Sequence, residues 1–69
     1  MQNDYSKLLG RMKECGMTQE TLAYAIGISE STLNLKLNNK GVFTQKEIRN
    51  ITSSLSIEKE EIGAYFFAN

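Results

Sequence analysis

The chain has 69 residues, with eight lysines and arginines, eight aspartates and glutamates, no histidine and no proline. A chain of this length forms one domain, predicted over residues 1–69, with a small core and little room for a deep catalytic cleft. It lacks the Cys/His/carboxylate clusters of metal sites and has no glycine-rich phosphate loop. We therefore expect no enzyme activity, no cofactor, no metal and no small-molecule ligand.

The N-terminal segment and the cysteine content indicate the compartment. The segment MQNDYSKLL lacks the basic-then-apolar layout of a signal peptide, and no apolar run reaches the length of a membrane-spanning helix. The single Cys15 has no internal disulfide partner, which is typical of a reducing environment. These features predict a cytoplasmic protein that does not interact with membranes.

Apolar residues recur at helical spacing along the chain, and no run alternates as a half-buried strand does. The first helix is predicted from about Asp4 to Cys15, with Gly16 as the residue that ends it. The predicted buried stripe of this helix is Tyr5, Leu8, Met12 and Cys15.

Two short helices joined by a tight turn are predicted over Thr18–Ile26 and Ser29–Asn38. Thr18 and Ser29 can each cap a helix, because a side-chain oxygen there accepts from free backbone N–H groups. Gly27 lies in the turn, where reversal of the chain needs a positive φ that glycine adopts without strain. Helices arranged in this way form a helix-turn-helix.

The last part of the chain predicts two more helices. Thr44-Gln45-Lys46-Glu47 is a capping box that starts a helix running to about Ser54. A final helix begins near Glu58 and carries Phe66, whose ring cannot face inward together with that of its neighbour Phe67 on one helix. The predicted fold class is therefore all-α, with five short helices in one compact domain.

Several short motifs occur in a defined order along the chain. They are Thr18-Gln19, Leu22-Ala23, Ile26-Gly27-Ile28, Ser29 and Leu33, followed by Leu37-Asn38-Asn39-Lys40-Gly41 and Leu55-Ser56-Ile57. On these motifs the chain resembles the lambda-repressor-like DNA-binding domains, the group of phage Cro proteins and xenobiotic-response-element-type regulators. The resemblance implies a transcriptional regulator, such as a Cro-like repressor, that binds a near-palindromic operator in double-stranded DNA.

Some positions depart from the pattern of that family. Lys36 stands where relatives often have an apolar residue, so Leu37 is expected to take the core role. Met12 occupies the place of an arginine that braces helix two in relatives, with Arg11 beside it. Glu30 replaces a frequent glutamine; an acid there suits the helix dipole but repels phosphate, unless it accepts from a cytosine amine.

The third helix is expected to read DNA. With Leu33 and Leu37 facing the core, a rotation of about 100° per residue turns a polar face outward, where side chains can hydrogen-bond base edges. The predicted base-reading residues are Glu30, Ser31, Thr32, Asn34 and Leu35, although a singly exposed leucine is also ordinary. The predicted phosphate contacts, guided by the resemblance, are Thr18, Gln19, Lys36, Asn38, Lys40 and Lys46.

One helix-turn-helix module reads only a short half-site, so a homodimer is expected, in solution or only on DNA. Its predicted contacts are Phe66 and Phe67; the alternative is that both rings are absorbed into an irregular C-terminal turn. A different function also remains open. The zero net charge and Glu30 favour a protein-interaction module, antitoxin-like or adaptor-like, that uses the same fold.

Overall fold

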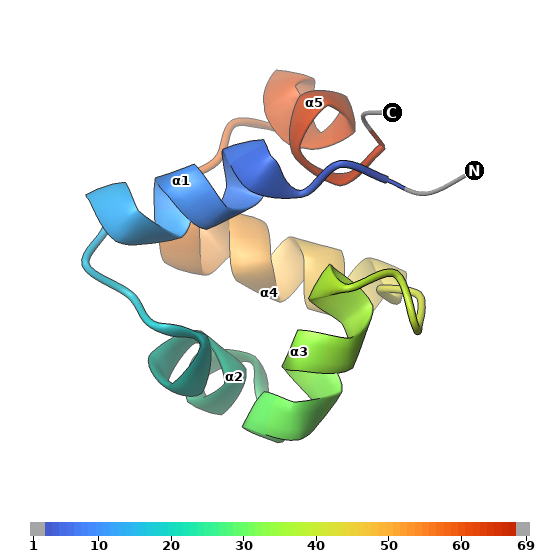
Figure 1. The fold of residues 1–69 in the computed structure, drawn as a ribbon. Coiled ribbons are helices and arrows are strands. Elements are labelled where there is room, and N and C mark those ends of the chain that lie inside the picture. Colours follow the sequence, from blue (N-terminus) through green and yellow to red (C-terminus); the bar gives the residue numbers. More distant parts are fainter. Residues whose placement is uncertain (1–2, 68–69) are drawn as a thin grey trace.

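The computed structural model describes residues 3–67. Over those residues the chain forms five α-helices and one 3-10 turn, and no strand (Figure 1). The elements are α1 (Ser6–Glu14), α2 (Gln19–Ile26), α3 (Glu30–Leu37), α4 (Gln45–Leu55), the 3-10 turn η1 (Lys59–Glu61) and α5 (Ile62–Phe66). The predicted all-α fold of five short helices is confirmed.

The starts of α2, α3 and α4 lie at the side-chain caps that the sequence predicted. The hydroxyls of Thr18, Ser29 and Thr44 each accept from the backbone N–H three residues further on, at 3.1 Å. The capping box at Thr44 is complete, because the Glu47 carboxylate accepts from the Thr44 N–H at 2.9 Å. Local chemistry therefore sets where these helices begin.

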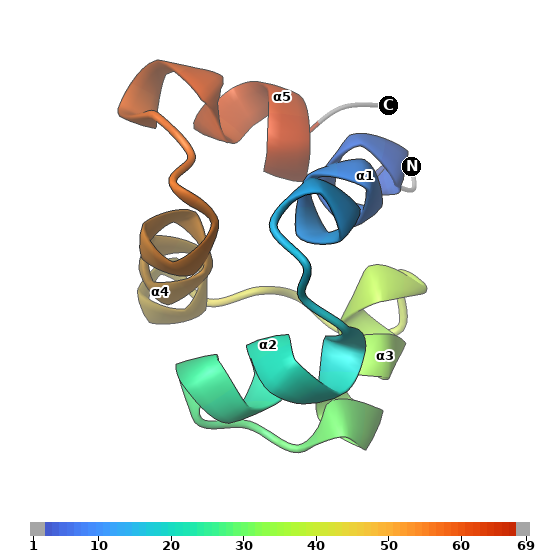
Figure 2. The same cartoon turned by 90° about the vertical axis from the view of Figure 1, so that its left-hand side faces the viewer.

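The turn between α2 and α3 is built on Gly27, which has a left-handed φ of 79° as predicted. The next residue closes the end of α2, since the Ile28 N–H donates to the Ala23 carbonyl at 3.0 Å. The two helices lie together at one end of the domain, and α5 lies at the opposite end (Figures 1 and 2). α4 crosses between them and packs against α2.

The core is one apolar cluster to which every α-helix contributes. Its buried residues are Tyr5, Leu8, Met12, Leu22, Ala23, Ile26, Leu33, Leu37, Phe43, Ile51, Leu55, Ile57, Tyr65 and Phe66. Phe43, between α3 and α4, meets the rings of Tyr5 and Phe66 edge to face, with centroids 5.5 Å and 5.6 Å away. This aromatic row joins both ends of the chain to the middle of the fold. No helix in residues 3–67 is long and apolar enough to cross a membrane.

Two predictions about individual side chains are wrong. Cys15 was expected in the buried stripe of the first helix, but it is exposed. The helix ends at Glu14, so its periodicity no longer directs the side chain that follows. Phe66 was expected at a dimer interface, but its ring is 1% exposed and fills the core, whereas Phe67 is 61% exposed. The prediction that burying one ring exposes the other is confirmed.

Candidate interaction surface

The outer face of α3 carries the polar side chains that helical rotation predicted. Leu33 and Leu37 are buried, and the exposed residues on the other side are Glu30, Ser31, Asn34, Leu35 and Asn38. Thr32 is only partly exposed, and its hydroxyl accepts from the Ser29 hydroxyl at 2.8 Å. Thr18 is likewise engaged in its cap, with its hydroxyl accepting from the Thr21 N–H. These two hydroxyls therefore already have partners within the chain.

A row of amide side chains links α2 to α3. The Asn34 side-chain NH₂ donates to Oε1 of Gln19 at 3.1 Å, and that of Asn38 donates to the Asn34 carbonyl at 2.8 Å. Three predicted contact residues thus lie beside one another on the surface, although Gln19 and Asn34 are 15 residues apart in sequence. The row is neutral and offers both donors and acceptors to a partner.

Lys36 faces α4 and not the solvent. Its Nζ donates to both carboxylate oxygens of Glu47, at 2.6 Å and 2.7 Å, and the two side chains are 14% and 13% exposed. Partial burial alone would raise the pKa of the Glu47 carboxyl, but hydrogen bonds from Lys36 and the Thr44 backbone hold it below its usual value. This intramolecular ion pair occupies the ammonium that the sequence had assigned to phosphate, so we leave Lys36 out of the interaction surface.

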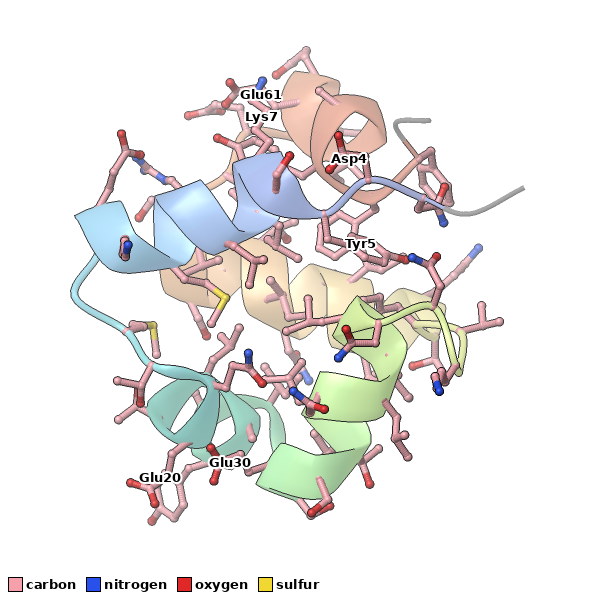
Figure 3. All side chains as sticks on the ribbon, in the orientation of Figure 1. Asp4, Tyr5, Lys7, Glu20, Glu30 and Glu61 are labelled. Atoms are coloured by element: carbon pink, nitrogen blue, oxygen red, sulfur yellow. The ribbon has the colours of Figure 1, made fainter. Side chains whose placement is uncertain are left out.

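The end of the domain formed by α2 and α3 is acidic. Between Thr18 and Leu35 the sequence has two glutamates and no lysine or arginine. Figure 3 places Glu20 and Glu30 at this end, away from α1 and α5. Tyr24 follows Glu20 by four residues, hence on the same helix face, and is 89% exposed. We call Glu20, Tyr24 and Glu30 the acidic tip.

The predicted cations Lys40 and Lys46 lie outside this tip. Both are exposed, Lys40 in the segment after α3 and Lys46 in the first turn of α4. Within residues 3–67 no three His, Cys, Asp or Glu side chains converge on a point where they could hold a metal ion.

Sequence reasoning missed two contacts that hold the surface in place. Arg11, next to the buried Met12, donates from Nε to the Leu55 carbonyl at 2.9 Å and from Nη2 to the Ser56 carbonyl at 3.4 Å. This arginine therefore braces the end of α4 and not α2. The sequence showed an arginine next to the position where relatives have one, but which carbonyls Arg11 reaches depends on how α1 crosses α4.

The second missed contact fixes the exit from α3. Asn39 has a left-handed φ of 62°, its Oδ1 accepts from the Asn3 N–H, and its side-chain NH₂ donates to the Asn3 carbonyl, both at 2.9 Å. The amide thus pairs with the N-terminal backbone as a neighbouring strand would. An asparagine just past a helix end is a frequent left-handed residue, which is the signal that was available.

The fold and surface define a small all-helical domain in which α3 presents a polar outer face. The chain belongs to the family described as Protein of unknown function (DUF739), whose model matches residues 1–69. It is similar to the modulator of repression (MOR) of the temperate bacteriophage TP901-1 from Lactococcus lactis, known from a solution structure. The identity is 42%, the match covers 97% of this chain and 90% of that one, and the TM-score is 0.81. The search of curated proteins found no match.

Proposed function

We propose that the protein is a phage-type regulator that modulates repression by binding another protein through its acidic tip. The regulatory role is supported by the 42% identity to the phage protein named modulator of repression. The mode of action follows from the surface of this chain, because the charge of the acidic tip determines which partners the tip can approach.

The observation that carries the proposal is the charge of the tip. DNA-binding surfaces gain most of their affinity from lysines and arginines that neutralise phosphates. Here Glu20 and Glu30 stand at the starts of the two helices of the motif, and Lys36 is held by Glu47. A duplex phosphate approaching the tip would meet two carboxylates and no free cation from the two helices.

The same chemistry suits a basic protein surface. Carboxylates at the tip can occupy the positions that phosphates take on the DNA-facing side of a helix-turn-helix repressor, whose lysines and arginines would pair with them. Exposed Tyr24 provides a large apolar contact with a hydroxyl at its edge, the kind of side chain that dominates protein interfaces. Such binding would cover the repressor and release its operator.

Direct DNA binding is the second candidate, and the amide row favours it. Asn34 and Asn38 can each make a bidentate pair with adenine, and Ser31 is exposed beside them. Lys40 and Lys46 are exposed and could contact phosphates. A regulator of this kind would act as a homodimer on a near-palindromic operator. If the protein binds DNA in this way, Asn34→Ala should weaken binding to the preferred site by about 1–3 kcal/mol and binding to random DNA by much less.

The experiment compares two partners directly. The full chain is titrated with a repressor encoded by the same phage or prophage and, separately, with random-sequence duplex at several salt concentrations. We expect binding to the repressor only, and competition between the chain and operator DNA for it. Replacing both tip carboxylates, Glu20→Gln with Glu30→Gln, should weaken this binding about tenfold, since each charge pair contributes up to about 1 kcal/mol.

A matched control removes two exposed acids elsewhere, Glu14→Gln on α1 with Glu60→Gln on η1, and should leave the affinity unchanged. Duplex binding whose logarithm falls steeply with the logarithm of salt, without repressor binding, would contradict the proposal and favour the second candidate.

A further inference from the structure

A shallow groove lies between α4 and the C-terminal segment of the domain. Its lining residues are Gln45, Ile48, Arg49, Lys59, Ile62 and Phe67. Ile48 and Ile62 are half-buried and pack against the core, so they form a fixed apolar floor. Phe67 is 61% exposed beside them. We call these six residues the α4–α5 groove.

Two cations lie at the edge of this apolar floor. Arg49 comes from α4 and Lys59 from η1, and both residues are exposed. The ion pairs found within residues 3–67 join Arg11 to Glu14 and Lys36 to Glu47, so neither groove cation has a carboxylate partner in the described part of the chain. The groove therefore combines apolar contact area with positive charge that lacks an internal partner.

We infer that the α4–α5 groove binds an acidic segment of a partner protein that carries a bulky apolar side chain. The apolar side chain lies against Ile48, Ile62 and Phe67, and carboxylates of the segment face the two cations. Burying an exposed aromatic ring and its apolar neighbours provides affinity, and the charges provide orientation and specificity.

The arrangement fits this occupant better than a second copy of the chain. A symmetric dimer through the groove would bring Arg49 and Lys59 of both copies into one interface, and none of the lining residues carries a carboxylate to pair with them. DNA is also a poor fit, because its sugar-phosphate backbone is dominated by charged phosphates and offers little apolar area to cover Ile48, Ile62 and the Phe67 ring. An acidic segment satisfies both the charge and the apolar floor.

The groove is separate from the acidic tip. Figures 1 and 2 both place α5 at the end of the domain opposite to α2 and α3. The inference therefore does not rest on the proposed function, and a partner in the groove would not compete with a partner at the tip. A chain with two such surfaces can join two proteins.

The test uses two helical peptides of the same length with leucines at i, i+3, i+4 and i+7, one with glutamates at all other positions and one with lysines. Each is titrated into the isotopically labelled full chain and followed by NMR. We expect the glutamate peptide to shift the amide signals of Ile48, Arg49 and Phe67, and the lysine peptide to leave them in place. Arg49→Glu with Lys59→Glu should weaken the glutamate peptide about tenfold and allow the lysine peptide to bind.

The matched control is Lys13→Glu with Lys40→Glu, which makes the same change in net charge at exposed sites outside the groove. It should leave the preference for the glutamate peptide unchanged. Phe67→Ser should weaken that peptide without altering the signals of the core. Equal binding of the two peptides, or equal losses in the groove variant and the control, would overturn the inference. So would a self-association of the chain that sedimentation detects and that Phe67→Ser abolishes, because a second copy would then occupy the groove.

Discussion

The ion pair between Lys36 and Glu47 joins α3 to α4, and its removal should destabilise the fold measurably. Lys36→Met keeps the aliphatic stem but leaves the Glu47 carboxylate 13% exposed without its cation. Removing one partner of a buried pair costs about 3–5 kcal/mol of unfolding free energy. Because both side chains here keep some exposure, we expect a loss at the lower end of this range, about 3 kcal/mol. A chain of this size has a total stability of roughly 3–10 kcal/mol, so the loss is a large fraction of it.

Urea unfolding of a double-mutant cycle measures the pair itself. The cycle comprises the original chain, Lys36→Met, Glu47→Gln and the double variant, in which no charge is left unpaired. We expect a coupling energy of about 2 kcal/mol, which means that the double variant loses less stability than the two single variants lose together. As a control, Glu14→Gln breaks the exposed pair with Arg11, whose N–O distance is 3.4 Å, and should cost about 0.5 kcal/mol or less. A Lys36–Glu47 coupling as small as this would refute the reasoning.

The pair also predicts how stability depends on pH. The pKa of Glu47 is lowered in the folded chain, so the unfolded state binds a proton at a higher pH than the folded state does. The stabilisation is therefore complete above the ordinary value of 4.5 and is lost as the pH falls from there through the folded pKa. Glu47→Gln should flatten this part of the profile of unfolding free energy against pH.

Three further perturbations test the local contacts. The methyl group of Gly27→Ala meets no neighbour, but alanine must adopt a φ of 79°, so thermal unfolding should show a loss of stability of about 1–2 kcal/mol. Gly10→Ala lies inside α1 and should stabilise the fold by up to about 1 kcal/mol. Two stability changes of the same sign would contradict this. Arg11→Met removes the hydrogen bonds to the carbonyls at the end of α4, and urea unfolding should show a loss of stability of about 1–2 kcal/mol, with Arg11→Lys intermediate. An unchanged urea midpoint would mean that these hydrogen bonds are not needed for stability. Asn39→Ala removes two hydrogen bonds and puts alanine in a left-handed conformation, so it should reduce stability by about 2 kcal/mol. Asn39→Gly should reduce stability less, because glycine adopts this conformation without strain. The opposite order would show that the backbone conformation does not matter.

The sequence by itself determined where most of the helices begin and how the second turns into the third. Caps at Thr18, Ser29 and Thr44 act on N–H groups three residues away, and Gly27 acts on its own backbone. Interactions of such short range do not depend on the rest of the fold, so they can be predicted from residue type and spacing. The same is true of the polar outer face of α3, which follows from Leu33 and Leu37 facing the core.

Only the tertiary structure decided which partners the remaining side chains found. Lys36 was available for DNA in the sequence, but the crossing of α3 and α4 brings it to Glu47, eleven residues away. The direction of Arg11 toward α4 and the choice of Phe66 over Phe67 for the core likewise depend on where α1 and α5 pack. The physical reason is that a long side chain reaches groups from several elements, and the relative placement of those elements is set by burial of the whole apolar cluster and not by local sequence.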